Sequence, residues 1–349
     1  MVFEAGHSLR SKLSALPKVE LHRHLEGSLR LETLVEIART HHLDLPSYDL
    51  ETLRPLVQVV GGDSPDFSTY LEKFKLLRRF YATPELIARM VHECIADAAA
   101  DNIKYLELRF NPVALSKFRG FELEQAMLWV TEAAEQAQRD HHVTVRLIVQ
   151  IGRDESVFTA RRIAEAAVAA RHRGVVGLDL AGDETAYPAT PFIEVFRWAK
   201  EQGLHITIHA GEVGPSANIR QAVEHMGAER IGHGVRAGED PKLVQWLAEQ
   251  GVTLEMCPTS NLHTGAVAGP SEHPLRRYLE RGVRVTINTD DPGISSTTLT
   301  DEYLLAVQHM GMDLPAIQQT ILYAAAAAFL PKDERGALVT WFEQVFAPL

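Results

Sequence analysis

Histidine and acidic side chains stand at the ends of several short apolar runs in this 349-residue chain. VELHRHLEG places His22 and His24 two residues apart, HITIHAGE contains His209, and VTINTDDP contains Asp290. Because side chains alternate faces along a strand, His22 and His24 point to the same side and can share one metal ion. A third histidine and a carboxylate from distant strands would complete a site of three nitrogens and one oxygen, with a position open for water.

Each of these motifs alone also has a structural explanation. Two histidines in an HxH pattern are often ordinary polar side chains, and His233, between two glycines, can belong to a turn. The acidic pair before Pro292 can be a solvated turn or a helix cap. Their shared position favours the metal site, because each cluster follows a short aliphatic run and the loops of a parallel barrel gather catalytic groups on one face.

The chemistry of this set depends on what else stands nearby. Neutral imidazoles with one carboxylate suit zinc, which lowers the pKa of bound water towards about 7. Glu212 lies three residues after His209 across a small Ala-Gly turn, either as a general acid or as a carboxylate favoured at a helix start. His233 is placed to orient or deprotonate the water. Asp291 is placed to bind substrate or to support a metal ligand.

The composition restricts the class of protein and of partner. With 46% hydrophobic and 23% charged residues, the chain has the balance of a soluble globular protein. A net charge of −11 argues against nucleic acid or an anionic membrane as the main partner. Cys94 and Cys257 cannot form a disulfide framework, and we expect a cytoplasmic protein without a signal peptide or a membrane span.

Several common catalytic signatures are missing from the sequence. The zinc deaminase pattern H-x-E with P-C-x-x-C is absent, because Cys257 precedes Pro258 and no second cysteine is near. A Walker-type phosphate loop and a strand-anchored GxGxxG are also absent, which disfavours phosphate transfer and dinucleotide redox chemistry. Zinc chemistry on a nucleobase would therefore have to use the barrel residues.

Short strand-like runs alternate with longer amphipathic stretches along the whole chain. Such alternation predicts an α/β fold with a parallel sheet and right-handed crossovers. Eight runs favour a single (β/α)₈ TIM barrel, with residues 1–349 as one domain, over two domains. The runs are 19–24, 103–110, 143–151, 175–180, 205–209, 230–234, 252–257 and 283–288.

The first gap between strands, from about 29 to 102, is too long for a simple crossover and predicts a helical insertion beside the metal. One helix in it has apolar side chains at i, i+3, i+4 and i+7, which makes one apolar face. The four residues are Phe67, Tyr70, Leu71 and Phe74. We call this set the lid stripe. The stripe is either ordinary core packing or an apolar lid over a bound heterocycle. Residues 313–349 predict extra C-terminal helices packed on the barrel.

Segments from Leu16 almost to the C-terminus resemble the adenosine deaminase family, a zinc-dependent branch of the amidohydrolase barrels. In family order they are PKVELHRHLEGSL, YLEKF, KYLELRFNP, VVGLDLAGDE, HAGEVG, RIGHG, CPTSN and NTDDP. HxH alone is generic to many amidohydrolases, whereas HAGE together with NTDDP and LAGDE is more specific. The resemblance implies hydrolytic deamination of adenosine, and of 2′-deoxyadenosine, to the inosine product and ammonia.

The resemblance also implies roles for individual residues. Glu212 corresponds to the acid that protonates purine N1, and His233 to the group that positions or deprotonates the hydroxide. The backbone N–H of Gly182 corresponds to the donor to N3, and Asp291 to the partner of N7. The family's apolar gate over the nucleoside falls on the lid stripe. One zinc ion per chain would be held by His22, His24, His209 and Asp290.

One departure leaves the substrate open. The animal enzymes have Asp after HxHL, where it contacts the sugar 5′ region, whereas this chain has Glu26. A related aminopurine is therefore an alternative substrate: adenine, a 5′-modified adenosine or aminodeoxyfutalosine. Two more functions fit a barrel of this kind: hydrolysis of an unrelated amide or ester, and catalytically silent binding of nucleosides or of a protein partner. By alternation, Arg23 should point away from the metal into an ion pair behind the barrel mouth.

Overall fold

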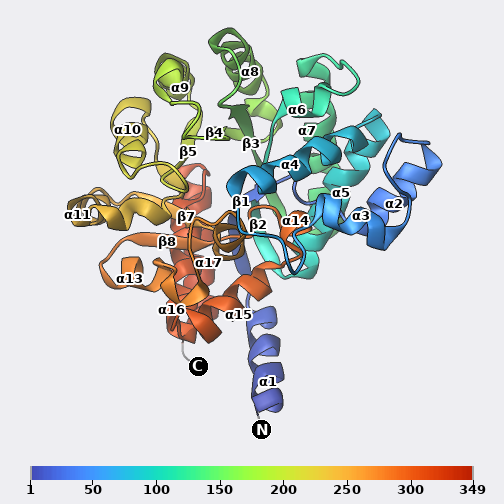
Figure 1. Ribbon diagram of the computed structural model, residues 1–349. Helices are drawn as coiled ribbons and strands as arrows, with labels where there is room; N and C mark the ends of the chain where they lie inside the picture. The colour runs from blue at the N-terminus through green and yellow to red at the C-terminus, as the bar shows by residue number, and fades with distance from the viewer. Residues whose placement is uncertain (1, 348–349) are drawn as a thin grey trace.

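The computed structural model describes residues 2–347, and its core is a sheet of eight parallel strands in chain order (Figure 1). Each strand pairs with the next one along the chain, which confirms the predicted barrel. The predicted strand-like runs agree with the observed strands to within one residue at each end. The strands are β1 Lys18–His24, β2 Ile103–Phe110, β3 Thr144–Gly152, β4 Val175–Ala181, β5 His205–Ala210, β6 Arg230–His233, β7 Thr253–Met256 and β8 Arg284–Ile287.

The seam between β8 and β1 differs from the seven regular ladders. It is joined beyond the end of β8, where Arg23 and Asp290 form an isolated parallel bridge. The Asp290 N–H donates to the His22 carbonyl at 3.0 Å, and the His24 N–H donates to the Asp290 carbonyl at 2.8 Å. The barrel therefore closes through the same residues that were predicted to bind metal.

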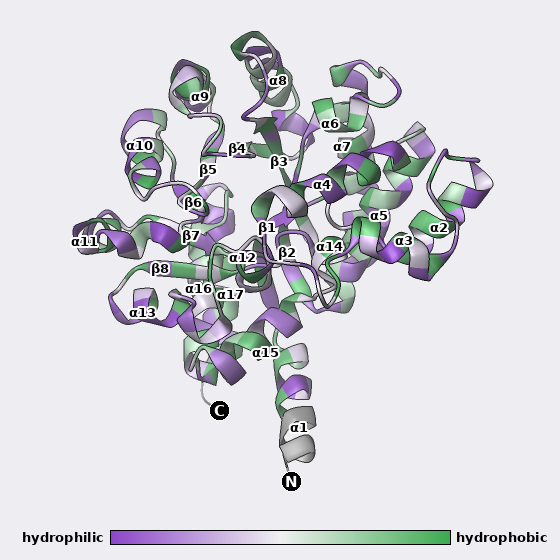
Figure 2. Cartoon of the chain, in the orientation of Figure 1, coloured by the Kyte–Doolittle hydropathy of each residue, from purple (hydrophilic) through white to green (hydrophobic). Residues whose placement is uncertain are grey.

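Amphipathic helices cover the outside of the strands. Figure 2 shows apolar and polar residues interleaved on these helices, as expected for elements that bury one face against the sheet. In α5, Pro84 occupies the first turn and the Thr83 side chain accepts from the Leu86 N–H, which fixes where the helix begins. The covering helices are α5 Pro84–Ala100, α7 Leu123–His141, α8 Val157–Ala169, α9 Ile193–Glu201, α10 Ala217–Met226, α11 Pro241–Gln250, α13 Leu275–Glu280 and α16 Leu314–Ala327.

The segment between β1 and α5 folds into three helices and one 3₁₀ turn on the barrel mouth. They are α2 Leu31–Thr40, α3 Leu50–Val57, α4 Phe67–Leu77 and the turn η1 Arg78–Phe80. Asp66 begins α4, because its carboxylate accepts from the Thr69 N–H at 2.7 Å. The Asp66 N–H donates to the carbonyl of His263, at the end of a loop helix on the mouth. These contacts place α4 over the carboxyl ends of the strands, where Figure 1 shows it near β1.

The remaining helices lie at the chain ends and in the loops. The predicted terminal segment 313–349 folds into α16 and α17, and residues 348–349 lie outside the described residues. Across the described part of the chain, no helix combines the length and the apolar character needed to cross a membrane. These remaining helices are α1 Val2–Ala15, α6 Pro112–Ser116, α12 Pro258–His263, α14 Pro292–Ser295, α15 Leu299–His309 and α17 Lys332–Phe346.

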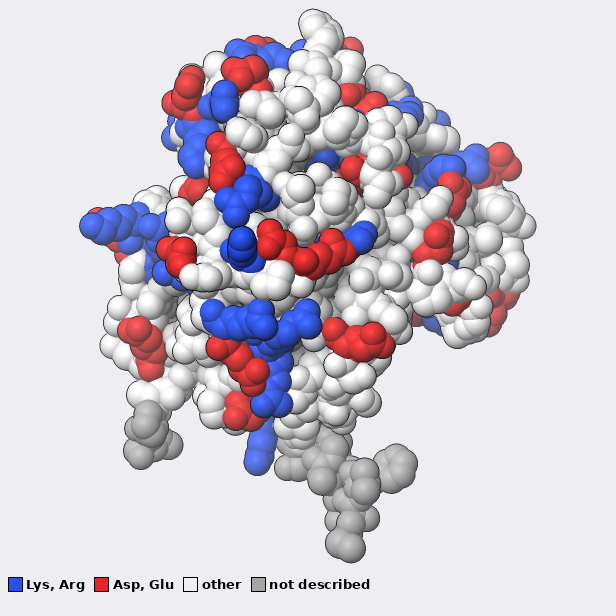
Figure 3. Space-filling view, turned by 60° about the vertical axis from the view of Figure 1, so that its left-hand side comes forward, with Lys and Arg blue, Asp and Glu red and all other residues white. Residues whose placement is uncertain are grey.

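The charged side chains of both signs are mixed on the surface. On the face in Figure 3, Lys and Arg alternate with Asp and Glu in short clusters. Many of them pair within a helix turn, as Arg276 does with Glu280 at 2.7 Å and Arg236 with Glu239 at 2.6 Å. Because exposed pairs of this kind are worth only about 0–1 kcal/mol, they contribute little to stability.

Candidate active site

The four predicted metal ligands meet at the carboxyl end of the barrel. The Nε2 atom of His24 lies 3.3 Å from the Nε2 atoms of both His22 and His209. Asp290 Oδ1 lies 3.1 Å from the Nε2 atoms of His22 and His24. One ligand atom from each of the four residues falls within 4.8 Å of the others, so the set can hold a single ion. The donor set of three imidazoles and one carboxylate suits zinc.

A second grouping overlaps the first. His22 and Asp290 also come within 4.8 Å of His233 and Cys257. Ligation by Cys257 would require the thiolate, and burial raises the pKa of this thiol well above its ordinary value. The Cys257 Sγ instead lies 3.6 Å from the Glu255 carbonyl. The set with three histidines and Asp290 is therefore the better metal site.

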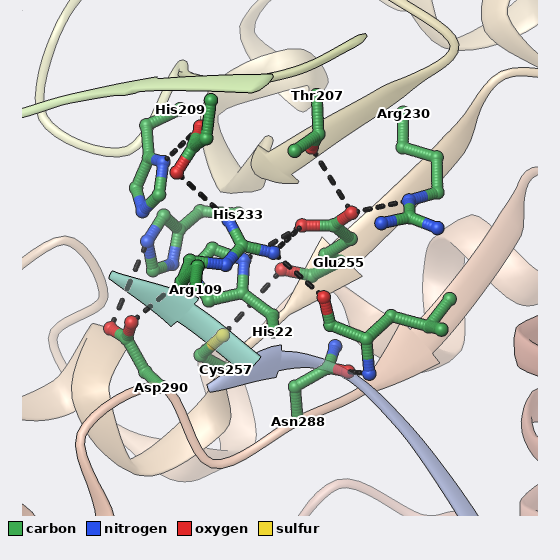
Figure 4. Close-up of polar contacts among 12 residues, drawn as sticks. His22, Arg109, Thr207, His209, Arg230, His233, Glu255, Cys257, Asn288 and Asp290 are labelled. Atoms are coloured by element: carbon green, nitrogen blue, oxygen red, sulfur yellow. Dashed lines mark hydrogen bonds and ion pairs between the residues drawn. The ribbon is translucent and has the colours of Figure 1, made fainter. Parts of the chain in front are cut away.

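Buried carboxylates contact the rings of two predicted ligand histidines, and Figure 4 shows Glu255 in the polar network with His22. Glu255 Oε2 lies 2.8 Å from His22 Nδ1, and Asp179 Oδ1 lies 3.0 Å from His209 Nδ1. Arg109 donates to Asp179 at 3.1 Å and to Glu255 at 2.8 Å, so it joins the two carboxylates. Such partners fix the tautomer and the direction of a metal-binding imidazole, here with Nε2 towards the cluster.

The Glu212 carboxyl faces the same cavity beside the metal ligands. Its Oε1 accepts from the Thr264 hydroxyl at 3.0 Å. Burial raises the pKa of Glu212 well above its usual range, and the negative charges of Asp290 and Glu184 raise it further. This shift favours the protonated form that a general acid requires.

Glu184 binds the backbone turn that carries Glu212. Its Oε1 accepts from the N–H groups of Glu212 at 2.8 Å, Val213 at 3.1 Å and Gly214 at 2.8 Å. Its Oε2 accepts from the Gly211 N–H at 3.0 Å and from the side-chain amide of Asn218 at 2.8 Å. Five donors on one buried carboxylate leave this turn little freedom, so the position of Glu212 is set by a residue from the loop after β4.

The two adjacent aspartates at the seam have opposite pKa shifts. Burial alone would raise the pKa of Asp290, but hydrogen bonds with His22 and His24 hold it well below its usual range. For Asp291, burial and then the negative charge of Asp290 raise the pKa well above the ordinary value. The Tyr70 hydroxyl donates to Asp291 Oδ2 at 3.1 Å. Asp290 is thus suited to bind a cation, and Asp291 to face a neutral ligand.

His233 lies at the end of β6 with a positive φ of 61°. Its Nε2 lies 3.6 Å from Glu212 Oε2 and 3.8 Å from Asp290 Oδ2. Burial lowers the pKa of His233 well below its ordinary value, so the ring is neutral at physiological pH. A side chain at the preceding Gly232 would come within 3.0 Å of the His22 ring, which explains the need for glycine there.

A cavity of about 280 Å³ joins these groups under α4. On the side of the predicted metal site, the cavity wall does not include His22. It is formed by His24, His209, Glu212, His233 and Asp290. The cavity is also lined by every predicted substrate-side residue: Glu26, Phe67, Tyr70, Leu71, Phe74, Gly182 and Asp291. Cavities of about 510 and 980 Å³ elsewhere are larger, but they contain none of these residues.

The end of the cavity away from the metal is polar. Glu26 Oε1 accepts from the Asn111 N–H at 2.7 Å, and burial raises the Glu26 pKa to about 7. Glu26 Oε2 and Gln150 Oε1 are buried and have no hydrogen-bond partner among the described residues. Arg78, the first residue of η1, also lines the cavity. Arg23 points to the other side of β1, where it pairs with Glu20 at 3.2 Å, as alternation predicts.

Several residues of the site have no prediction from sequence. Asp179 and Glu255 stand within the strand runs VVGLDL and VTLEMC, and Arg109 within IKYLELRF. A charged residue inside an otherwise apolar strand was the available signal, because a buried parallel strand has no other reason to carry one. Glu184 lies within the LAGDE motif, but its contacts with the turn at 211–214 have no signature in local spacing.

Comparisons of sequence agree with this geometry. A family model described as adenosine deaminase matches residues 17–345. The adenosine deaminase of Klebsiella pneumoniae is 37% identical over 326 residues, covering 93% of this chain and 97% of that protein. The adenosine deaminase of Shewanella loihica is 37% identical over 325 residues, covering 93% of this chain and 98% of that protein.

Solved structures with the same fold extend the comparison. An adenine deaminase from Arthrobacter aurescens has a TM-score of 0.87 and 29% identity, covering 95% of this chain and 100% of that one. An amidohydrolase from Burkholderia ambifaria with bound Zn has a TM-score of 0.85 and 26% identity, covering 96% and 93%. The Arabidopsis protein ADAL, in complex with IMP, has a TM-score of 0.85 and 27% identity, covering 95% and 98%.

Proposed function

The chain belongs to the adenosine deaminase family and is a hydrolytic purine deaminase, and we propose that its substrates are adenosine and 2′-deoxyadenosine. Water would replace the 6-amino group, giving inosine or 2′-deoxyinosine and ammonia. The observation that carries the proposal is the Glu212 carboxyl, buried beside the His22, His24, His209 and Asp290 cluster with its pKa well above the usual range. A proton donor next to a metal site is what attack on an aromatic amidine carbon requires.

The metal is proposed to be one zinc ion per chain, held by the four residues of that cluster. A zinc ion supplies a nucleophile at neutral pH by lowering the pKa of bound water. The protein contributes the orientation of the ligands, because Glu255 and Asp179 hold two of the histidine rings from behind.

The remaining roles are those that the resemblance to the family implies for residues that line the cavity. Glu212 donates its proton to purine N1, which withdraws electrons from C6 and makes that carbon electrophilic. Its orientation comes from Thr264 and from the turn bound by Glu184. The Gly182 N–H would face N3 and the Asp291 carboxyl would face N7. With Glu212 at N1, the protein would then contact the purine ring on three sides.

The insertion helix α4 is proposed as the lid of the site. The four residues of the lid stripe line the cavity, and Tyr70 links the helix to Asp291 on the barrel. A bound nucleoside would lie between this apolar face and the metal cluster. Excluding water there strengthens the electrostatic interactions that stabilise charge at C6 and N1.

A second candidate is deamination of the free base adenine, and one residue favours it. Glu26 stands where the animal adenosine deaminases have Asp, and its Oε2 is buried without a partner among the described residues. The Arthrobacter aurescens protein of similar structure is an adenine deaminase. A longer side chain at this position would occupy part of the space that a ribose requires.

A substrate panel separates the two candidates. Zinc-loaded enzyme would be tested on adenosine, 2′-deoxyadenosine, adenine, 5′-methylthioadenosine and AMP, with ammonia release measured for each. We expect the highest kcat/KM with adenosine or 2′-deoxyadenosine. Adenine as the best substrate would replace the first proposal by the second, and no ammonia from any aminopurine would reject both.

A further inference from the structure

A buried side-chain relay runs from the loop before α13 to His233. Asn261, on α12, lies between two histidines, with its Nδ2 3.0 Å from His233 Nδ1 and its Oδ1 3.3 Å from His273 Nε2. All three side chains are buried. Neither Asn261 nor His273 lines the cavity, although the Asn261 side chain also hydrogen-bonds the Glu212 carboxyl. Within the described part of the chain, neither residue is hydrogen-bonded to a predicted metal ligand.

The outer end of the relay is fixed by the backbone. The N–H of Leu275 donates to His273 Nδ1 at 3.3 Å, so this ring nitrogen must be an acceptor. Burial lowers the pKa of His273 to about 3, which keeps the ring neutral. A neutral imidazole has one proton, and here it must lie on Nε2, where it donates to Asn261 Oδ1.

This bond determines which way the Asn261 amide faces. Its oxygen is directed to His273, so its NH₂ group is directed to His233 Nδ1 and donates to it. His233 Nδ1 is therefore an acceptor, and the single proton of the neutral ring lies on Nε2. The surroundings are compatible with this tautomer, because Nε2 faces the ionised Asp290 carboxylate, with Oδ2 at 3.8 Å.

We propose that Asn261 and His273 are positioning residues that hold His233 as the Nε2–H tautomer, so that His233 donates a hydrogen bond to the attacking water oxygen and does not accept its proton. The inference rests on the proposed deamination, since it assigns the direction of one hydrogen bond in that reaction. The sequence left two roles open for His233, to orient the attacking water or to deprotonate it. The proposed tautomer selects the first role.

The substitution Asn261→Asp reverses the relay without changing its shape. A carboxylate accepts from His273 through one oxygen and from His233 Nδ1 through the other, so the His233 proton moves to Nδ1 and Nε2 becomes an acceptor. Loss of one donor to the reacting oxygen should lower kcat by about 10²–10³-fold. We expect KM and zinc content to stay close to wild type. If His233 were a base, the same change would keep or raise kcat, and that outcome would overturn the proposal.

The tautomer itself can be observed independently of activity. Histidine ring nitrogens labelled with ¹⁵N report which nitrogen is protonated, and the His233 signals can be assigned by their loss in His233→Gln. We expect an Nε2–H ring in the wild-type holoenzyme and an Nδ1–H ring in Asn261→Asp. A wild-type ring protonated on Nδ1 would reject the proposal, even if the enzyme deaminates adenosine as proposed. If another purine is the better substrate, the same measurement still tests the tautomer of His233.

Two variants of His273 distinguish loss of the relay from loss of packing. His273→Leu removes the donor, so the Asn261 amide can turn over and kcat should fall. His273→Gln keeps an N–H donor and should restore most of kcat, whereas equal loss in both variants would contradict the relay. Asn102→Asp is the control for added charge. It is the same amide-to-acid change at a residue whose side chain, among the described residues, bonds only the Ala15 carbonyl.

Discussion

The two ends of the active-site cavity differ in how their polar atoms are satisfied. At the metal end, His22 and His209 have carboxylate partners, and Asp290 Oδ2 accepts from the Ser260 hydroxyl at 2.7 Å. At the opposite end, Glu26 Oε2 and Gln150 Oε1 are buried without partners in the part of the chain that the structure describes. The predicted metal ligands thus have partners within the protein, although Arg109 Nε and Asp291 Oδ1 near them are buried without partners among the described residues. At the second end, two acceptor oxygens of the lining itself are left for a ligand.

This difference between the two ends suggests that the metal end determines the reaction and the far end determines which substrate is preferred. Groups at the metal end are held in their reactive geometry before substrate arrives, which is how an enzyme stabilises charge that develops in the transition state. A buried polar atom without a partner costs about 1–3 kcal/mol, and a substrate that supplies the partner recovers that energy. Substitutions at the metal end should therefore lower kcat, and substitutions at the far end should change which purine is preferred.

The largest effect should come from Asp290→Ala. The variant loses the carboxylate ligand and leaves three imidazoles at the site, so we expect both metal and deaminase activity to be lost. Metal content by elemental analysis and ammonia release measure the two losses. Asp333→Ala, an exposed change in α17, is the control. A metal-free variant that retains activity would remove the metal from the mechanism.

The next effect separates the acid from the metal. Glu212→Gln keeps the shape of the side chain and a hydrogen-bond donor but cannot deliver a proton, so turnover should fall by roughly 10²–10⁴-fold. Zinc content and nucleoside binding should persist, as elemental analysis and calorimetric titration would show. Near-normal ammonia release from the Gln variant would make Glu212 a structural carboxylate and would remove the basis for the proposed mechanism.

A smaller effect is expected one layer below the ligands. Glu255→Gln removes the charge that faces the His22 ring and one partner of Arg109, so zinc affinity should fall by about 10- to 100-fold. Competition with a zinc chelator measures the change. Activity should return at saturating zinc, because no group in contact with the purine is altered. Unchanged affinity would show that the metal end does not depend on its carboxylate layer.

The smallest effect concerns the far end. Glu26→Gln retains the acceptor for the Asn111 N–H and alters only the unpartnered side of the carboxyl. If that side contacts ribose, kcat/KM for adenosine should fall by about 2- to 12-fold, corresponding to roughly 0.5–1.5 kcal/mol, and kcat/KM for adenine should stay constant. Glu36→Gln, at an exposed position of α2, is the matched control. Equal losses on both substrates would place Glu26 against the base and erase the distinction between the two ends.

The fold was predictable because its signals are local. Alternation of apolar runs with amphipathic stretches indicated the eight strands, and the strand ends indicated His22, His24, His209 and Asp290. The spacing of Phe67 and Phe74 indicated one helix face, although the Tyr70 hydroxyl, bonded to Asp291, makes that face less apolar than the pattern suggested.

The supporting residues were not predictable because their contacts depend on register between strands. Whether Glu255 on β7 meets His22 on β1 follows from how the barrel closes, and no spacing within either segment contains that information. The same holds for Glu184, whose donors come from a turn 27–30 residues further along the chain. His273 has no motif at all, and only the backbone N–H of Leu275 shows which tautomer it adopts.

The seam of the barrel has a consequence for how the protein is made. Thr289 donates its N–H to Glu20 at 2.8 Å across 269 residues of chain, and the ligands His22 and Asp290 flank the same seam. Two histidine ligands are therefore translated long before the carboxylate that completes the set. A nascent chain can hold metal at full strength only after β8 has left the ribosome and joined β1. Metal loading of the proposed site would therefore have to follow the synthesis of β8.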